Sequence, residues 1–265
     1  MGNNELVHII KEDDIAILQL KRYEKRNALN SALLEAIRSS IEQLSHDPVK
    51  GIIITGANDA FSAGIDYMEL ASRIQEFEDK RNFRLIIREM QTKFSIIENV
   101  EKPIIAALNG YCYGSGLELA LACDFRVAVT DVKIGMLETQ LNLIPDLGGT
   151  TRLVRTVGVQ NAKRIIMLAE KLDAQEAKNL GLIDWIVDQP SNLIPKAKEI
   201  LNKIKENGPL AVGLAKILIH QVYGHSSEFG LNLERMAQSH LIDTSDLEEA
   251  FMAKLEKRKP VFKAK

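Results

Sequence analysis

Two glutamates twenty positions apart are the residues of this sequence best suited to chemistry. Glu118 follows the glycine-rich segment Gly114-Ser115-Gly116, and Glu138 follows an apolar segment further along. Apolar runs flank the glycines, so a strand, a tight turn and a helix are predicted. The free N–H groups of such a turn can hold an oxygen that gains negative charge, and an acid one turn later can move protons beside it. This pairing indicates chemistry next to a polarised carbonyl.

A second glycine turn offers another hydrogen-bond donor. The segment Phe61-Ser62-Ala63-Gly64-Ile65-Asp66 ends an expected strand and opens an expected helix. One interpretation is a tight turn in which Asp66 helps to cap the helix. The other is that the residue after Gly64 donates its N–H to a substrate. Because both glycine turns follow buried strands, we expect them at the same sheet edge, where two amides would bracket one oxygen.

Both glutamates lie in apolar sequence surroundings. A buried carboxylate costs free energy unless it is paired, hydrogen-bonded or protonated. Two acids in apolar settings favour raised pKa values, so that one is protonated while the other is ionised and the pair serves as acid and base. The structural alternative for Glu118 is an ion pair with a basic side chain such as Arg126 or Arg152.

Asp146 is a third candidate acid, within Ile144-Pro145-Asp146-Leu147-Gly148-Gly149-Thr150. It is either an N-cap or turn aspartate or a third catalytic carboxylate. The two glycines indicate close backbone approach, and neither a Walker pattern nor a dinucleotide fingerprint is present. A serine hydrolase with Ser115 as nucleophile is a further alternative. Against it, Gly114-Ser115-Gly116 lacks the five-residue nucleophile elbow, and no histidine lies in a recognisable partner motif.

Composition narrows the function classes. Apolar residues make up 46% and charged residues 26%, which is ordinary for a globular protein, and the net charge of −2 gives no overall field that would attract nucleic acid or an anionic membrane. No apolar run approaches the ~18 residues needed to span a bilayer. With only Cys112 and Cys123 and no signal-like N-terminus, we expect a cytoplasmic protein with two buried thiols.

The elements that must position these residues follow from hydrophobic periodicity. Strands are predicted at 7–10, 15–20, 51–55, 103–108, 125–129 and 184–188. A first helix is predicted from a cap at Asn30 or Ser31 to near Asp47-Pro48, and further helices at 67–98 (one or two), 160–169, 174–180, 192–206, 210–223, 227–241 and 245–257. Helical segments between strands imply mostly parallel pairing. Asn207-Gly208-Pro209 predicts a boundary between an α/β core, 1–207, and a helical C-terminal region, 208–265, that packs on another subunit.

Taken together, these segments resemble the crotonase superfamily, also called the enoyl-CoA hydratase/isomerase family. The resemblance rests on ordered matches over nearly the whole chain: Glu24-Lys25-Arg26-Asn27-Ala28-Leu29, Phe61-Ser62-Ala63-Gly64-Ile65-Asp66, Lys102–Gly110, Gly116-Leu117-Glu118-Leu119-Ala120, Cys123-Asp124, Leu143-Ile144-Pro145 with Gly148-Gly149-Thr150, and Glu256–Phe262. It implies an α/β fold, a crotonase-like spiral of β-β-α units with a helical C-terminal region. It also implies a homotrimer or a homohexamer made of two trimers.

The resemblance further implies an acyl-CoA thioester as ligand, with no metal and no cofactor beyond the coenzyme A of the substrate. By position, the N–H groups of Ile65 and Ser115 would form an oxyanion hole for the thioester oxygen; the family commonly has glycine where this chain has Ser115. The residues implied to contact substrate are Lys25, Arg26, Ala28, Ala63, Asp66, Tyr67, Met68 and Gly114.

Within the family, the reaction type follows the acids. Hydratases carry glutamates at the positions of Glu118 and Glu138, so the leading hypothesis is an enoyl-CoA hydratase that adds water across the 2,3 double bond. Asp146 departs from the glycine common in hydratases and matches some dienoyl-CoA isomerases, so a double-bond isomerase is the alternative. A non-catalytic member that binds RNA or protein is a third hypothesis, and the lack of a basic stripe argues against it. Binding of nucleic acid or membrane is not expected.

Overall fold

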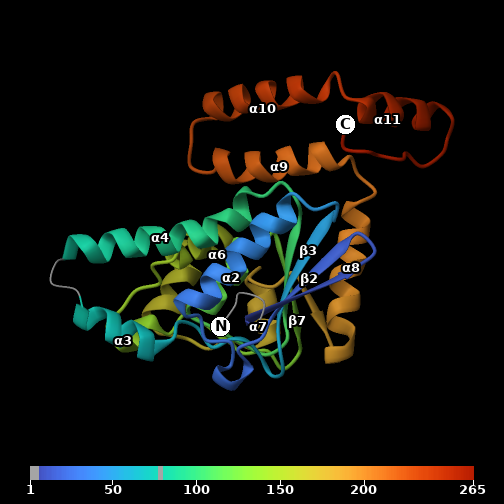
Figure 1. Cartoon of the computed structure of the whole chain (residues 1–265). Helices are drawn as coiled ribbons and strands as arrows, with labels where there is room; N and C mark the ends of the chain where they lie inside the picture. Colours follow the sequence, from blue (N-terminus) through green and yellow to red (C-terminus); the bar gives the residue numbers. More distant parts are fainter. Residues whose placement is uncertain (1–5, 77–79) are drawn as a thin grey trace.

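A twisted six-stranded sheet forms the centre of the computed structural model, which describes residues 6–76 and 80–265 (Figure 1). The strands lie in the order β1-β2-β3-β5-β7-β9. β1 and β2 form an antiparallel hairpin, and every later neighbour pairs in parallel. Their bounds are β1 Val7–Glu12, β2 Ile15–Leu20, β3 Gly51–Gly56, β5 Ile104–Leu108, β7 Phe125–Val129 and β9 Trp185–Val187. β3 and β5 are buried along their whole length, as continuous apolar runs predict for central parallel strands.

A second, parallel sheet of three short strands stands beside the first in the order β4-β6-β8. Its members are β4 Ala60–Ser62, β6 Tyr111–Tyr113 and β8 Ile134–Gly135. Each follows a long strand closely, so the chain places one strand in each sheet before a helix returns it. This β-β-α spiral confirms the predicted fold class. The sequence pattern read 56–66 as loop and located none of the three, because two or three residues are too few to show a period.

Helices cover both faces of the large sheet. Their bounds are α2 Ser31–Ser45, α3 Tyr67–Glu76, α4 Lys80–Asn99, α5 Ser115–Ala122, α6 Gly149–Met167, α7 Ala174–Asn179, α8 Leu193–Ile204, α9 Pro209–Val222, α10 Ser227–Leu241 and α11 Ser245–Leu255, with the 3-10 turns η1 Tyr23–Lys25, η2 Glu138–Leu141 and η3 Pro190–Asn192. α6 is kinked at Gly158, whose φ is 75°. The expected segment 67–98 is two helices, and 77–79 between them lie outside the described residues.

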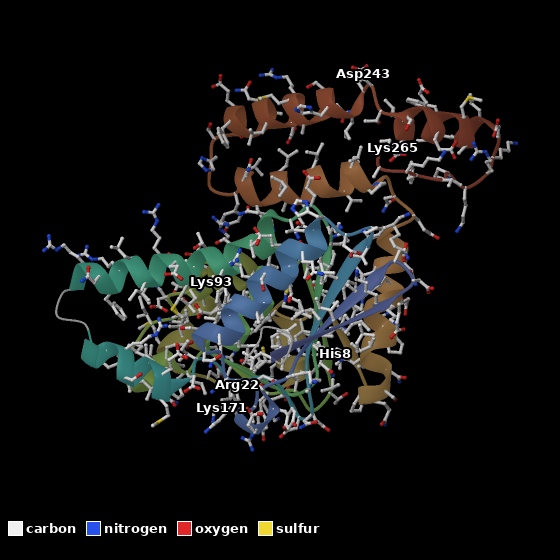
Figure 2. All side chains as sticks on the ribbon, in the orientation of Figure 1. His8, Arg22, Lys93, Lys171, Asp243 and Lys265 are labelled. Atoms are coloured by element: carbon white, nitrogen blue, oxygen red, sulfur yellow. The ribbon has the colours of Figure 1, made fainter. Side chains whose placement is uncertain are left out.

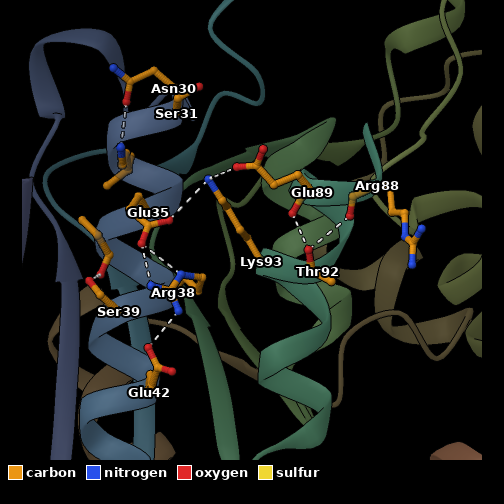
Figure 3. Close-up of polar contacts among 12 residues, drawn as sticks. Asn30, Ser31, Glu35, Arg38, Ser39, Glu42, Arg88, Glu89, Thr92 and Lys93 are labelled. Atoms are coloured by element: carbon orange, nitrogen blue, oxygen red, sulfur yellow. Dashed lines mark hydrogen bonds and ion pairs between the residues drawn. The ribbon is translucent and has the colours of Figure 1, made fainter. Parts of the chain in front are cut away.

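α2 shows how the sequence builds these elements. The Asn30 side chain accepts the N–H of Leu33 at 2.9 Å and caps the helix, one of the two caps the sequence allowed. On the face toward α4, Lys93 lies between Glu35 of α2 and Glu89 of its own helix, at 3.3 and 3.1 Å (Figure 3). The partly exposed bridges add little stability, but they align two helices whose apolar sides are buried.

The C-terminal helices α9, α10 and α11 stand apart from the sheet, with α9 lying along α4 (Figure 1). α9 begins at Pro209, directly after the boundary proposed from the sequence. A buried lysine ties α9 to the core: Lys216 Nζ donates to the carbonyl oxygens of Ile97 and Lys102 at 2.9 and 3.0 Å and lies 3.0 Å from the Asp124 carboxylate. The Lys216 contacts pack the C-terminal helices against the core. The boundary between two domains at residue 207 therefore stays a prediction.

The chain end folds back onto α11 (Figure 2). The Asp246 carboxylate accepts the N–H groups of Lys263 and Ala264, and the carbonyl oxygen of Lys265 accepts from Ser245 Oγ at 2.9 Å. Large apolar side chains remain at least half exposed on this region, among them Ile219, Tyr223, Leu231, Met236, Phe251 and Leu255. Such an apolar surface is more than an isolated domain needs to expose.

Two expectations from composition can be compared with the structure directly. Cys112 and Cys123 are free and buried, as predicted. Within 6–76 and 80–265, no helix combines the length and the apolar character needed to cross a bilayer.

Candidate active site

The turn between β6 and α5 has a backbone that only glycine adopts readily. Gly114 has φ 50° and ψ −125°, and its carbonyl oxygen accepts the N–H groups of Leu117 and Glu118 at 2.8 and 3.0 Å. A Cβ built on Gly114 would lie 2.8 Å from Glu138 Oε1, so a side chain there would collide with that carboxylate. The turn therefore both starts α5 and leaves room for Glu138.

The turn after β4 packs directly against the first one. Gly64 has φ 100°, and a Cβ on it would lie 3.6 Å from the backbone N of Ser115. A Cβ on Gly116 would lie 2.7 Å from the Cβ of Ser62, in the other turn. The Ser62 hydroxyl accepts the Gly64 N–H at 3.1 Å and donates to the carbonyl of Asn27, which fixes the turn. The structure thus brings the two predicted turns together.

Two amides from these turns are left free. Among the described residues, neither the Ile65 N–H nor the Ser115 N–H has a hydrogen-bond acceptor. Ser115 opens α5, where the first N–H groups of a helix have no partner within the helix and the helix dipole is positive. The Ile65 and Ser115 amides therefore offer donors to an oxygen that carries negative charge.

Glu118 is buried within α5, with 1% of its surface exposed. Its Oε1 accepts two backbone N–H groups, from Leu147 at 2.9 Å and from Gly149 at 2.7 Å. Burial raises the pKa of Glu118 to about 8, and the nearby Glu138 and Asp146 carboxylates push in the same direction, while the two N–H groups oppose the rise. The side chain is held in one place and titrates near neutral pH.

The alternative that Glu118 pairs with an arginine is wrong. Arg126 pairs with Asp184 at 3.3 Å, and Arg152 pairs with Glu98 at 2.5 Å. The glycine pair that the sequence marked as a close approach explains the difference. A Cβ on Gly149 would lie 2.5 Å from Glu118 Oε1, so the backbone itself reaches the carboxylate and takes the place of a cation.

Glu138 opens η2, directly after β8 and Leu137. Its two carboxylate oxygens are buried and have no hydrogen-bond partner among the described residues. Burial raises the pKa of Glu138, and the Asp146 carboxylate adds to the rise. Tyr67 of α3 lies close enough that the Glu138 charge contributes, after burial, to raising the pKa of its phenol. A buried acid without a partner is a candidate to hydrogen-bond a ligand.

Asp146 is half-buried in the turn before α6, and burial raises the pKa of its carboxyl group. The N-cap of α6 is Gly148, so Asp146 does not cap that helix. Its carbonyl oxygen accepts from Gln91 Nε2 of α4 at 2.6 Å, which anchors the turn. Asp146 therefore contributes a third negative charge beside Glu118 and Glu138, as the sequence allowed.

The segment predicted to contact coenzyme A lies beside the second turn. The Ala63 N–H donates to the carbonyl of Arg26 at 2.9 Å, and the Ala28 N–H donates to that of Lys25 at 3.0 Å. Lys25 and Arg26 are exposed, and the Arg26 guanidinium lies 5.1 Å from the Tyr111 ring centroid. These residues form a cationic surface next to Ile65.

The three residues that follow Ile65, which are Asp66, Tyr67 and Met68, differ in their contacts and exposure. Asp66 pairs with Arg22 at 2.6 Å and accepts the Met68 N–H at 3.0 Å, so it serves as the helix cap that the sequence also allowed. Although burial opposes the change, the Arg22 guanidinium lowers the pKa of Asp66. Tyr67 and Met68 are 49% and 80% exposed and are accessible to a ligand.

The serine-hydrolase alternative finds no support. Ser115 is buried at the start of α5, and no hydrogen bond joins it to a histidine in the described part of the chain. Sequence reasoning missed the two amides that hold Glu118, although the glycines at 148 and 149 pointed to that loop. It also missed Glu98, for which the sequence carries no local signal.

A small apolar cavity lies between α2, α3 and α4. Its volume is about 30 Å³, and its lining includes Ile65, Leu70, Ile86 and Met90. Two other cavities, of about 480 and 890 Å³, lie at the carboxyl edge of the large sheet and between α9 and the core. None of these three cavities is lined by Glu118 or Glu138, so the clustered acids and free amides mark the site better than a cavity does.

Comparison with known proteins identifies the family of this chain. The family described as enoyl-CoA hydratase/isomerase matches residues 11–265. The chain is 37% identical to a crotonyl-CoA hydratase of Syntrophomonas wolfei, covering 98% of this chain and 99% of the relative. It is 37% identical to a short-chain-enoyl-CoA hydratase of Clostridium acetobutylicum, covering 96% and 97%. The crystal structure of an enoyl-CoA hydratase from Bacillus anthracis superposes with a TM-score of 0.89 at 36% identity, covering 98% and 100%. The chain belongs to the enoyl-CoA hydratase/isomerase family.

Proposed function

We propose that the protein is an enoyl-CoA hydratase, which adds water across the 2,3 double bond of an acyl-CoA thioester. The addition passes through a state in which the thioester oxygen carries enolate charge. The Ile65 and Ser115 amides form the oxyanion hole that stabilises this charge. Their free N–H groups and the 3.6 Å approach of the Gly64 Cβ position to the Ser115 nitrogen support this assignment.

The two glutamates supply and remove the protons. Ionised Glu118 accepts a proton from water as the water oxygen bonds to C3, and protonated Glu138 donates a proton to C2. Glu118 then carries the proton and Glu138 the charge, and exchange with solvent restores both. The two N–H groups on Glu118 and the unpartnered oxygens of Glu138 support this division of roles. Because the pKa of Glu118 is about 8, the ionised form that accepts the proton is the minor form at neutral pH.

The observation that carries the proposal is the convergence of two free amides and two buried acids. Gly114 connects them, because it precedes the Ser115 amide and its missing side chain makes room for Glu138. The names of the relatives support hydratase activity independently. They also argue against a member that only binds RNA or protein.

The substrate binds through its coenzyme A and its acyl chain. The cationic surface at Lys25 and Arg26, with Ala28 and Ala63, receives the coenzyme A, and Ile65 to Met68 line the approach to the reacting carbons. No metal or further cofactor takes part in our proposal. The cavity beside Ile65, lined also by Leu70, Ile86 and Met90, offers an apolar surface to the acyl chain.

Assembly and location complete the proposal. The exposed apolar side chains of α9 to α11 support a homo-oligomer, a trimer or a pair of trimers, in which copies cover this surface. We place the protein in the cytoplasm, with the acyl-CoA thioester as its ligand and with neither nucleic acid nor membrane as a partner.

One observation favours a second activity. Asp146 adds a third acid whose charge reaches Glu138, and a proton taken from C4 and returned to C2 would move a double bond without water uptake. Assays of 2-enoyl-, 3-enoyl- and 3,5-dienoyl-CoA side by side in isotopically labelled water separate the two reactions. We expect labelled oxygen at C3 of the 2-enoyl product. Turnover of only the 3-enoyl or dienoyl substrate, without label, would replace hydration by isomerisation.

A further inference from the structure

The loop that holds Glu118 is itself held by a buried arginine. Arg152, in the first turns of α6, is 7% exposed, and its Nη1 donates to the Leu147 carbonyl oxygen at 2.9 Å. The N–H of the same Leu147 donates to Glu118 Oε1 at 2.9 Å. One residue therefore receives the arginine on its C=O and presents its N–H to the glutamate.

Gly148 makes this contact possible. A Cβ on Gly148 would lie 2.0 Å from Arg152 Nη1, so any side chain there would displace the guanidinium. Its φ of 103° also turns the chain so that the next N–H, that of Gly149, reaches Glu118 at 2.7 Å. The Arg152 guanidinium and the backbone of Gly148 together orient the two N–H groups that donate to Glu118.

A carboxylate from another helix fixes the arginine. Glu98 of α4 lies 2.5 Å from Arg152 Nη2, and the Ser95 hydroxyl lies 3.4 Å from the same atom. The other oxygen of Glu98 is 3.6 Å from His220 Nδ1 on α9. Both partners of the ion pair are largely buried, at 8% and 15% side-chain exposure, so the pair holds a defined geometry. A polar chain runs from α4 through Arg152 and Leu147 to Glu118.

We propose that Arg152, oriented by Glu98, is a positioning residue that keeps the Leu147 and Gly149 amides directed at the Glu118 carboxylate. The inference rests on the proposed role of Glu118 as the base that activates water. Arg152 does not contact Glu118 and acts only through the loop.

Loosening of the loop should raise the pKa of Glu118. The two amides lower the pKa of Glu118 against burial and against the Glu138 and Asp146 carboxylates that face it. If the loop loosens, that opposing effect weakens and the pKa rises further. A smaller fraction of Glu118 is then ionised at neutral pH, and the acidic limb of the rate profile moves to higher pH.

The test uses Arg152→Lys and Glu98→Gln in the full-length protein. Lysine keeps the charge but lacks the fork that bridges Leu147 and Glu98. We expect kcat for hydration of crotonyl-CoA to fall about 10- to 100-fold in R152K, with KM changed less than about two-fold and the acidic limb moved to higher pH. E98Q should change kcat in the same direction and by less. Two further ionisable groups face Arg152 and Glu98: the His220 imidazole, 3.6 Å from Glu98, and the Cys123 thiol, whose pKa burial raises and the Arg152 charge lowers.

Arg126→Lys is the matched control. Arg126 is also 7% exposed, pairs with one carboxylate and donates to the backbone carbonyls of Leu182 and Cys123, but it has no contact with the Glu118 loop. R126K should lower the thermal midpoint as R152K does while the pH profile stays in place.

The outcomes separate the inference from the proposed function. If R152K and E98Q keep the wild-type pH profile and resemble R126K in both kcat and KM, the positioning role is refuted. If Glu118→Gln hydrates at the wild-type rate, the proposed function fails first. If E118Q loses hydration activity while R152K and E98Q keep the wild-type pH profile, only the positioning role is rejected. If R152K does not fold, the milder E98Q decides by the same criterion.

Discussion

The two glutamates are buried in the same site but are held in opposite ways. Glu118 lies inside α5 with two backbone N–H groups on one oxygen, and a loop backed by Arg152 holds those donors. Glu138 lies at the start of a short 3-10 turn, and its oxygens have no partner among the described residues. The first acid is fixed in place by protein, whereas the second keeps its hydrogen-bonding capacity for a ligand.

This difference in hydrogen bonding lets one fold divide acid and base roles between two identical side chains. N–H groups stabilise an ionised carboxylate, so Glu118 is suited to accept a proton. Glu138 is suited to give a proton to a ligand, because burial raises its pKa and its oxygens make no hydrogen bond to the described residues. The experiments below test the different roles of Glu118 and Glu138, from the largest expected effect to the smallest.

The largest effect is expected from removing either acid. Glu118→Gln and Glu138→Gln keep the shape of the side chain and should each lower kcat for hydration by about 10²–10⁴-fold, since each removes one proton-transfer step. Steady-state hydration of crotonyl-CoA measures the loss. A variant with the wild-type rate would remove that glutamate from the mechanism.

Gly114, the glycine beside Glu138, should have the next largest effect. In Gly114→Ala the new Cβ would lie 2.8 Å from Glu138 Oε1, and the backbone has φ 50°, so Glu138 and the Ser115 amide both shift. We expect a loss in kcat of about 10²-fold. Gly224→Ala is the control, because its φ is 82° but nothing lies within 4 Å of the new Cβ. Equal losses in the two variants would mean that backbone strain alone is responsible.

Glu118 should also make stability depend on pH. Its pKa is raised from 4.5 to about 8 in the folded protein, so the folded state binds more protons than the unfolded state between these values. The contribution of Glu118 to stability is therefore fully present below pH 4.5 and is lost as the pH rises through 8. In Glu118→Gln this loss disappears, and the variant should gain on the order of 1–3 kcal/mol relative to wild type at pH 7–8.

Urea unfolding of the wild type and the Glu118→Gln variant at pH 5 and at pH 8 measures this difference. Crossing of the two stabilities, or a growing advantage of the variant with pH, agrees with a buried acid that must ionise. A difference that stays constant with pH would contradict the raised pKa.

The smallest effect is expected at Asp146. Asp146→Asn removes one charge that raises the pKa of both glutamates, so both values should fall. More Glu118 is then ionised and less Glu138 is protonated, and these changes oppose each other in the rate. We expect a change in kcat below about ten-fold, with the acidic limb at lower pH. A loss as large as that of Glu138→Gln would make Asp146 a proton donor in its own right.

Local sequence determined much of the framework. The alternation and apolar runs located all six strands of the large sheet within a few residues. Five of them, β1, β2, β3, β5 and β7, have five or six residues and are long enough to show a period, whereas the three-residue β9 lies within the predicted 184–188. Asn30 before α2 and the glycines before α5 and α6 act on their own neighbours, so their roles were readable directly. The family was readable for the same reason, since its motifs combine several such local constraints in order.

Short strands and distant partners were not readable. β4, β6 and β8 exist because parallel neighbours pair with them, and the pattern within two or three residues carries no such signal. The choice of Glu98 as the partner of Arg152, across 54 positions, depends on how α4 packs beside α6. The sequence suggested that Arg126 or Arg152 forms an ion pair with Glu118. In the folded chain, two backbone N–H groups contact Glu118 instead.

The chemical groups of the protein and the two glycine turns that expose backbone amides can be read from the sequence, because residue type and local backbone preference act over a few positions. Folding of the whole chain brings the two turns together, places two N–H groups on Glu118 while Glu138 has no partner among the described residues, and selects Arg152 as the arginine that contacts the Glu118 loop. These outcomes depend on burial and on contacts between segments far apart in the chain, and such contacts set the pKa values on which the proposed chemistry depends.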